Sequence, residues 1–464
     1  MKTTSFIRLA LIILSVMTGL GASGRGLDVE SAKYVALDFM RKHVAKSSSG
    51  MRFGCSLNPV LERVLPKGNE PGLYVFNFEG GGFAVVDATG SGGGEVVAYS
   101  ATGKFDYENA PSAALDILKC YLVSDWTASA EVESTMATVA DGKSVGPRVE
   151  TLWDQGNPYN LLCPVDPDEN VRSLTGCTAT AMAQLMRYHR YPAVGKGEIL
   201  YDWKGTRLSA NLNESTYLWD KMLPVYDSSS PAESNEAVAR LMADVGYALN
   251  TNYSAIESGA SNLMPVKAFT GNFGYDKSIR RLEKRFFSDE EWAEIIINEL
   301  NEGRPLMYSG SDEIGHAYVC DGYDAEGMLH FNFGWSGNSD GYYRLGSQPY
   351  DKNGEIHCNI MPDKGGEPVV EGFFYTDFCA TGDMISFGFK IMAGAATDIP
   401  VTLGYAIKNS DTGNIRYYAL ENMKAYCWLE IVRSTDEIEN LFLGDQNAGQ
   451  EPLAEGSYVV YPVY

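Results

Sequence analysis

The sequence predicts an α+β protein with three units: a small α+β unit, a larger α+β body and a β-rich C-terminal segment. Its 464 residues exceed what one ordinary core organises, which favours several domains. Between about 150 and 362, helical spacing of apolar residues gives way to strand-like apolar runs. Beyond 365, short segments alternate between apolar and polar residues, which is typical of a small β-sandwich.

The first residues have the order of a secretory signal peptide. Lys2 and Arg8 precede the apolar run Leu9–Leu20, and small residues follow up to Gly24. This run is shorter than the roughly 20 residues needed to span a bilayer. We therefore predict that residues 1–23 are a cleaved signal peptide, that the protein is secreted or extracytoplasmic, and that no segment spans a membrane.

Residues 24–143 form the first predicted unit. Its expected elements are a helix over 29–45, strands over 73–78 and 83–87 joined by a glycine turn at 80–82, a strand over 96–100 and a helix over 112–122. Residues 127–148 are small, polar and unpatterned, which indicates an exposed linker. A protease could reach Lys143 or Arg148 in this linker.

Residues 144–364 form the second unit, and residues 365–464 form the third. The second unit is expected to contain helices over 177–190, 231–248 and 289–302 and strands over 305–309, 316–323, 328–333 and 341–345. Alternation at 384–390 and 456–461 predicts strands of the β-sandwich-like third unit.

Composition excludes several functions. Sixty acidic side chains against 37 basic ones give a net charge of −23, which repels a nucleic-acid backbone and an anionic lipid surface. Eight cysteines are spread without a CxxC pair, so neither a zinc site nor a disulfide scaffold is indicated. We expect no metal, no organic cofactor and no nucleic-acid partner, and we assign no disulfide.

The stretch Thr175-Gly176-Cys177 places a cysteine directly after a glycine at the predicted start of a helix. The free N–H groups of the first turn and the helix dipole favour a thiolate there, which could act as a nucleophile. Cysteine is also among the residues most often buried. The stretch alone therefore leaves core packing as an equal alternative.

A thiolate that attacks a carbonyl group needs a general base nearby, and the chain offers five histidines. His43 precedes the linker, and His189 lies roughly 18 Å from Cys177 along the same predicted helix, so we exclude both. His316 opens a predicted strand directly after a glycine, which would expose it on one side and hold it on the other.

His330, in the middle of a strand, and His357, after a loop, remain formal alternatives to His316, although neither follows a glycine. The segment Asn332 to Trp335 returns beside His316 on the next strand. An amide there can hold an imidazole in the useful tautomer, and an aromatic ring can shield that contact from water.

Gln155 lies in a loop upstream of Cys177, where its side-chain N–H could join the Cys177 backbone N–H in an oxyanion hole. A glutamine in a loop is usually only polar surface. The order glutamine, cysteine, histidine, asparagine gives it more weight, because papain-like cysteine proteases carry these roles in this order.

These motifs resemble the streptopain family of secreted cysteine peptidases, in order and with little insertion over residues 155 to 345. The stretches that carry the resemblance are Gln155–Leu162, Gly176–Cys177, Gln184–Pro192, Leu241–Gly246, Asn272–Tyr275, Gly315–Ala317, Asp321–Gly322, Asn332–Trp335 and Ser339–Gly341. The resemblance implies a papain-like peptidase body in the second unit. The first unit is similar to the inhibitory propeptide of that family, which implies a zymogen, and we expect activation at Lys143.

By this resemblance Cys177 is the nucleophile, His316 the general base and then the general acid, and Gln155 the oxyanion donor. Asn332 and Trp335 fall in the segment that supports the histidine. The family often has Asn-Trp-Gly-Trp here, whereas this chain has Phe333 in place of the first tryptophan. An indole N–H is lost at that position, and catalysis is expected to be slower if that group helps to fix His316.

The implied function is that of a secreted cysteine endopeptidase, which hydrolyses protein or peptide substrates through a thioester acyl-enzyme and prefers an apolar P2 side chain. Its propeptide would be an intramolecular inhibitor. Two alternatives keep some of these features. One is a Cys–His amidase or transglutaminase-like acyl transferase, and the other is a catalytically weakened surface-binding protein.

Overall fold

A computed structural model describes ten ranges of the chain: 26–44, 58–89, 94–123, 135–310, 315–345, 354–375, 387–393, 399–425, 430–433 and 458–463. The predicted signal peptide, residues 1–23, lies outside these ranges. Within them, no helix is both long enough and apolar enough to cross a bilayer.

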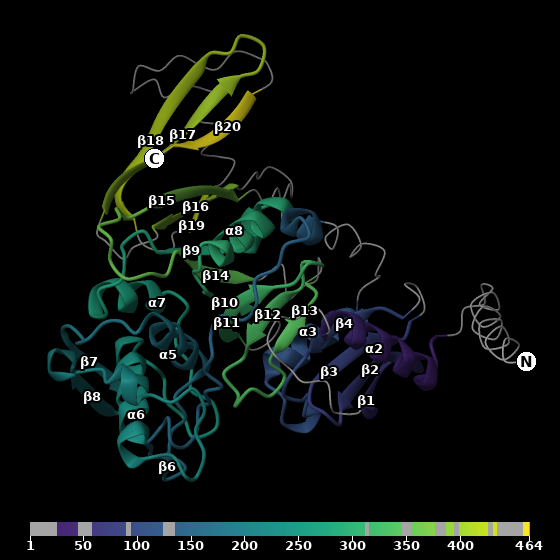
Figure 1. Ribbon diagram of the computed structural model, residues 1–464. Coiled ribbons are helices and arrows are strands. Elements are labelled where there is room, and N and C mark those ends of the chain that lie inside the picture. The colour runs from purple at the N-terminus through teal and green to yellow at the C-terminus, as the bar shows by residue number, and fades with distance from the viewer. Residues whose placement is uncertain are drawn as a thin grey trace, which may run out of the picture.

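One ten-stranded antiparallel sheet runs through the first unit and the body (Figure 1). Its order is β1-β2-β3-β4-β13-β12-β11-β10-β14-β9. The strands are β1 (Pro59–Lys67), β2 (Glu70–Phe78), β3 (Phe83–Asp87), β4 (Val96–Ser100), β9 (Arg280–Glu283), β10 (Leu306–Gly310), β11 (His316–Tyr323), β12 (Leu329–Asn332), β13 (Gly341–Tyr343) and β14 (Glu355–Cys358).

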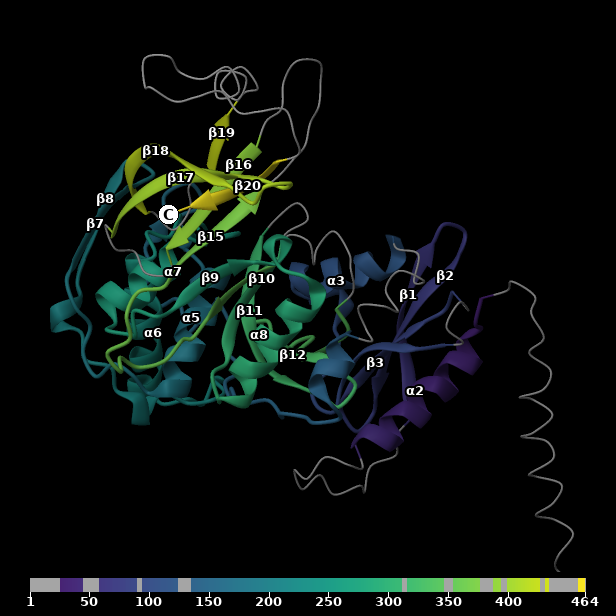
Figure 2. The same ribbon diagram turned by 90° about the horizontal axis from the view of Figure 1, so that it is seen from above.

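Helices cover both faces of the first unit's strands (Figure 2). Helix α2 (Val29–Val44) buries Ala32, Ala36 and Met40 against one face, because these residues recur at helical spacing. Helix α3 (Ser112–Val123) packs against the other face. Both helices and strands β2–β4 lie where the sequence predicts them.

Strand β1 is absent from the sequence prediction. Its central residues are mostly exposed, and Glu62, Arg63 and Pro66 interrupt any apolar pattern. Charged residues and proline are tolerated at a sheet edge, where one side of the strand has no pairing partner. An edge strand of this kind carries little hydrophobic signal.

The exposed linker predicted over 127–148 is only partly correct. Within its described part, residues 135–140 form a helical turn, and Met136 and Ala140 are buried in the core shared with the body. Residues 141–144 are exposed, as expected for an accessible segment. Val145 then forms a β-bridge with Tyr323, so the chain is fixed again two residues after Lys143.

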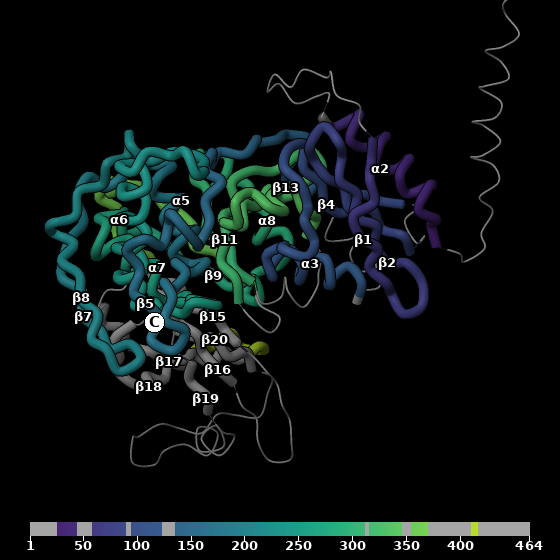
Figure 3. Tube along the Cα trace, turned by 90° about the horizontal axis from the view of Figure 1, so that it is seen from below, coloured from purple at the N-terminus to yellow at the C-terminus, as the bar shows by residue number. Residues whose placement is uncertain are grey.

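Two helices of the body lie on opposite faces of β11 (Figure 3). Helix α5 (Cys177–His189) packs with the face that contains Val319, and α8 (Asp289–Asn301) packs with the face that contains Tyr318. Side chains alternate across a strand, so one strand serves both cores. Helix α6 (Ala232–Ala248) packs against α5.

The remaining elements of the body are short. They are β5 (Val165–Asp166), β6 (Val171–Arg172), β7 (Glu198–Trp203), β8 (Thr206–Asn211), α7 (Met264–Lys267) and a π-helical turn over Ala268–Asn272.

The third unit contains two three-stranded antiparallel sheets, as expected for a sandwich-like segment. One has the order β15-β16-β19 and the other β18-β17-β20. Their strands are β15 (Val370–Tyr375), β16 (Phe387–Ala393), β17 (Ile399–Asn409), β18 (Ile415–Ala425), β19 (Glu430–Arg433) and β20 (Tyr458–Val463). The predicted strand start at 384–386 lies outside the described residues.

A buried carboxylate holds the segment that leads to the third unit. Asp276 accepts hydrogen bonds from the backbone N–H groups of Lys364 and Gly366 at 2.8 and 3.1 Å. Burial opposes the charge, but these bonds and those from Ser278 lower the pKa of Asp276 to about 2. The proposed boundary at 364/365 therefore lies in a tethered segment.

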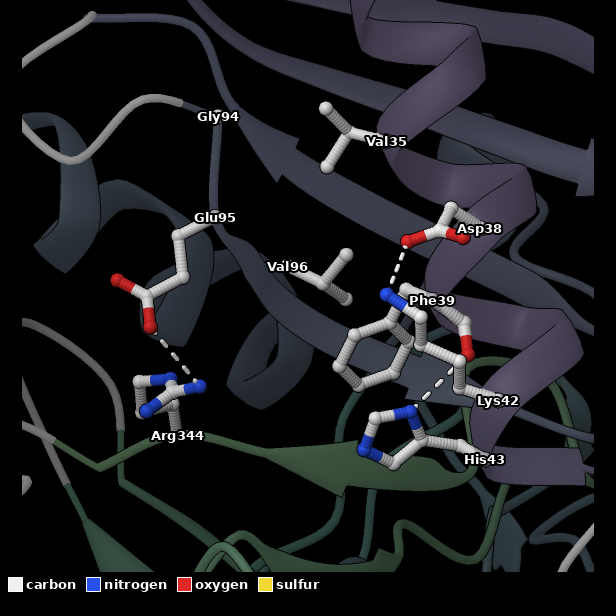
Figure 4. A pocket seen from close by; sticks show the side chains of 9 residues that line it. All are labelled: Val35, Asp38, Phe39, Lys42, His43, Gly94, Glu95, Val96 and Arg344. Atoms are coloured by element: carbon white, nitrogen blue, oxygen red, sulfur yellow. Dashed lines mark hydrogen bonds and ion pairs between the residues drawn. The ribbon is translucent and has the colours of Figure 1, made fainter. Parts of the chain in front are cut away.

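The first unit joins the body through strands β4 and β13. Tyr99 and Ala98 pair with Tyr342 and Tyr343, and the rings of Tyr99 and Tyr342 stack with centroids 5.0 Å apart. Beside this junction, helix α2, strand β4 and Arg344 line a cavity of about 500 Å³ (Figure 4). Figure 4 shows Arg344 of the body pointing to Glu95 of the first unit, at 3.2 Å.

Gly341 permits this strand pairing. A Cβ at this position would lie 2.5 Å from the Tyr99 carbonyl oxygen and 2.9 Å from the Phe83 ring, both in the first unit. We expect Gly341→Ala to destabilise the full-length protein by about 1–3 kcal/mol, as overpacking does. Thermal unfolding checks this, with Gly146→Ala as control because nothing lies within 4 Å of that position. Equal unfolding midpoints for the two variants would contradict the close approach.

Candidate active site

Gly176 lets Cys177 stand at the first position of α5. Its φ is +89°, a backbone conformation that favours glycine. A Cβ there would also lie 2.8 Å from the carbonyl oxygen of Ser258. Both facts exclude a larger residue, so the glycine next to the cysteine is required by the turn that presents the thiol.

The thiol of Cys177 faces the start of β11. The His316 imidazole is within hydrogen-bonding reach of it, and the Ala317 N–H donates to Sγ at 3.5 Å. Burial raises the pKa of the thiol, but the charge and hydrogen bond of His316, with the bond from Ala317, outweigh burial and lower it to about 7. This environment favours the thiolate over what burial alone would allow.

His316 is 7% exposed, and its Nε2 atom has a hydrogen-bond partner of its own. Nε2 lies 3.4 Å from the carbonyl oxygen of Phe333, so an Nε2–H donates to that oxygen. The other ring nitrogen, Nδ1, is then available to the thiol. Burial lowers the pKa of His316, but the Cys177 thiolate and this carbonyl outweigh it and raise the pKa above its ordinary value. The two groups therefore stabilise each other as a thiolate–imidazolium pair.

Trp335 lies beside the imidazole, as expected for the shielding aromatic. Its ring centroid is 6.1 Å from that of His316 in an edge-on arrangement. This contact places an apolar group beside the His316 ring.

The expected direct contact between the Asn332 amide and His316 is not what the structure shows. Asn332 Oδ1 accepts from Gln184 Nε2 at 3.0 Å and from the Gly334 N–H at 3.1 Å, while Nδ2 donates to the Thr151 carbonyl at 2.6 Å. The Gly334 N–H belongs to the same peptide group as the Phe333 carbonyl. Asn332 thus supports His316 through that peptide group.

The side chain of Phe333 points into the core, with its ring 5.0 Å from Tyr318 and 5.4 Å from Tyr343. What reaches His316 is the backbone carbonyl, which any residue supplies. Asp340, buried and with a pKa raised by burial to about 7, accepts the Phe333 N–H at 2.8 Å. Phenylalanine in place of tryptophan at 333 therefore leaves the hydrogen bond between His316 Nε2 and the residue 333 carbonyl in place.

Gln155 is 4% exposed, and its Nε2 is buried with no hydrogen-bond partner. The backbone carbonyl of Gln155 accepts the N–H of Thr175 at 3.1 Å, which places this residue beside the segment that leads to Cys177. A buried donor without a partner is costly unless something binds there. This donor fits an oxyanion that appears only during a reaction.

The other histidines are engaged elsewhere. His330 Nδ1 pairs with Asp321 at 2.6 Å, and His357 Nε2 contacts the Asn262 carbonyl at 2.9 Å. His43 lies 3.1 Å from Glu326, and His189 ends α5 against Tyr188. Both formal alternatives to His316 thus pair with groups other than Cys177.

The sequence reasoning gave no role to three contributors: the Ala317 N–H, Gln184 and Asp340. A backbone donor leaves no sequence signal. Gln184 and Asp340 lie in stretches that carry the resemblance, and Gln184 is also a large polar residue on the buried side of its helix. Across the described ranges, no group of three or more His, Cys, Asp or Glu side chains is arranged to hold a metal ion.

Known proteins were compared with this chain. The Peptidase C10 family matches residues 153–343, and the Spi protease inhibitor family matches residues 24–122. Streptopain of Streptococcus pyogenes is 32% identical in an alignment of 342 positions that covers 68% of this chain and 84% of that protein. Thiol protease/hemagglutinin PrtT of Porphyromonas gingivalis is 34% identical in an alignment of 342 positions that covers 64% of this chain and 38% of that protein.

A solved structure of a Prevotella intermedia prointerpain A fragment superposes with a TM-score of 0.54 at 27% identity, and covers 65% of this chain and 99% of that one. The mixed helices and sheets of the first unit and the body therefore have the predicted α+β, papain-like architecture with a propeptide. At this identity and coverage, the protein belongs to the Peptidase C10 family, which makes it a cysteine peptidase with an inhibitor-like domain in front of its catalytic body.

Proposed function

We propose that Cys177 and His316 form the catalytic dyad of a secreted endopeptidase, with Gln155 as oxyanion donor. The observation that carries the proposal is the placement of the Cys177 thiol against the His316 imidazole and the Ala317 N–H, where α5 and β11 begin. The lowered pKa of the thiol and the raised pKa of the imidazole agree with this placement. The buried, unpartnered Nε2 of Gln155 supports it independently.

The reaction follows from these positions. The Cys177 thiolate attacks the scissile carbonyl carbon, and the new oxyanion accepts from Gln155 Nε2 and from the Cys177 N–H, which has no acceptor within its own helix. The His316 imidazolium gives its proton to the departing amine. His316 then takes a proton from water, which attacks the thioester and releases the acid and the thiolate.

Inhibition by the first unit has a physical basis in the loop that follows Trp335. Asn338 in this loop accepts from the Asp106 N–H at 2.9 Å and donates to the Asn109 carbonyl at 2.8 Å. The Ser339 N–H donates to the Lys104 carbonyl at 3.1 Å. Residues 104–109 of the propeptide thus lie on the loop that carries the shielding tryptophan, which supports a zymogen.

The exposed segment 141–144 supports Lys143 as the activation site. Arg148 is a poorer one, since its N–H donates to Asp321 at 2.9 Å and its guanidinium to the Leu300 carbonyl at 3.2 Å. The Val149 N–H donates to the same carboxylate at 2.7 Å. A cut at Lys143 leaves this anchored segment with the body.

Family membership favours peptide hydrolysis over the amidase, transglutaminase-like and binding-only alternatives. Casein digestion by activated protein tests the assignment. We expect Cys177→Ala to abolish digestion and Gln155→Ala to lower kcat about 10²–10³-fold with little change in KM, the usual cost of losing one oxyanion donor. Glu150→Gln, on an exposed neighbour, should leave kcat near wild type. Undiminished digestion by Cys177→Ala would end the proposal.

The ion pair predicts how the thiol reacts with pH. Because only the thiolate is alkylated, iodoacetamide modification of Cys177 should rise through about pH 7. In His316→Gln the favourable charge is lost while burial remains, so the inflection should move above pH 7. Peptide mapping at Cys177 measures this separately from the other cysteines. An unchanged inflection in His316→Gln would exclude the pair.

Activation should depend on Lys143. We expect Lys143→Gln to slow conversion to the mature form, because Lys143 lies in the exposed segment. Arg148→Gln should leave the position of the cleavage site unchanged, because Arg148 is anchored to the body. N-terminal sequencing of secreted protein should find Ser144 at the start of the active form. An active form that begins at residue 24 would contradict this proposal.

A further inference from the structure

We propose that Gln184 is a positioning residue that fixes the three catalytic segments relative to one another; this rests on the proposed dyad. Gln184 lies seven residues after Cys177 on α5, which is two helical turns and about 10 Å along the axis. Seven residues return to nearly the same helix face, so Gln184 faces the same neighbours as the thiol.

The Gln184 side chain is fully buried and uses both ends of its amide. Oε1 accepts from the Thr151 hydroxyl at 2.7 Å, and Nε2 donates to Asn332 Oδ1 at 3.0 Å. Asn332 closes the network, since its Nδ2 donates to the Thr151 carbonyl at 2.6 Å. Thr151 and Asn332 are 4% and 2% exposed, so no member relies on surface water.

Each partner leads to a different catalytic group. Asn332 holds the Gly334 N–H, and the carbonyl of that same peptide group binds His316 Nε2. Thr151 begins the segment that places Gln155. Gln184 itself belongs to the helix of Cys177. One side chain therefore connects the nucleophile's helix, the acceptor of the histidine and the segment of the oxyanion donor.

The backbone at Gly334 lies in close contact with α5. Its φ is +69°, and a Cβ would lie 2.8 Å from Thr180 Cγ2 and 3.7 Å from Gln184 Nε2. The histidine's acceptor thus rests directly on the helix that carries the thiol. A change at Gln184 would shift the acceptor without touching the dyad.

The experiment compares Gln184→Met, which keeps the volume and removes both hydrogen bonds, with Met186→Ala on the same buried helix, which destabilises the core without touching the network. Gln184→Met should lower kcat about 10²-fold with KM nearly unchanged, as a small misplacement of a catalytic group does. Its Cys177 alkylation inflection should move to higher pH, because His316 no longer pairs well with the thiolate. Thr151→Ser, which keeps the hydroxyl, should retain activity.

Met186→Ala should lower the unfolding midpoint and leave both readouts unchanged. If Gln184→Met does not fold, Gln184→Leu decides, because its apolar side chain can neither accept from Thr151 nor donate to Asn332. A folded Gln184 variant with wild-type kcat and alkylation inflection would overturn the inference. The dyad itself is tested separately: Cys177→Ala stays inactive in that case if the proposed function is correct.

Discussion

The packing of α5 against β11 is the interaction on which the site depends. Cys177 begins the helix and His316 begins the strand, so the contact between the two elements brings their first residues together. Neither residue needs a long side chain or a loop to reach the other. The turn before Cys177 requires a glycine, because a Cβ at Gly176 would lie 2.8 Å from the Ser258 carbonyl oxygen. The chemistry is thus placed by rigid elements, which hold geometry better than loops do.

At this junction burial disfavours the charged forms of Cys177 and His316, and the charge of each partner favours them by more. Withdrawal from water disfavours the thiolate and the imidazolium when each is considered alone. Each becomes favourable because the other is present, and because Ala317 and Phe333 supply backbone groups of the right polarity. Cys163 shows the contrast: without such a histidine, burial raises the pKa of its thiol to about 12. The difference in pKa between Cys177 and Cys163 thus follows from the His316 partner more than from the position at a helix start.

Local patterns predicted the longer helices and most of the strands. They made Cys177, His316 and Gln155 candidates, because these residues sit at chain positions with recognisable turns or order, and the family resemblance supplied the proposed roles. The sequence could not show which atom accepts from His316, because that atom is a backbone carbonyl. Asn332 was expected to contact the imidazole directly, yet its amide is committed to Gln184, Thr151 and Gly334. Which partners a side-chain amide takes depends on its tertiary neighbours. Strand β1 likewise depends on a neighbour, because it forms by pairing with β2.

The exposed segment 141–144 lies between the propeptide's contacts and the anchors of the body, so a cut there would separate inhibition from release. Propeptide contacts such as the β4–β13 pairing and those to Asn338 precede this segment, and the anchors of the body begin at Val145 and continue to the Asp321 carboxylate. While the chain is intact, the propeptide is held at the high effective concentration of a tethered partner. A cut at Lys143 would remove the tether without loosening the body. The β4–β13 pairing, the Asn338 contacts and the shared core would then have to hold the propeptide by their own affinity. The same interface can therefore be sufficient before cleavage and insufficient after it.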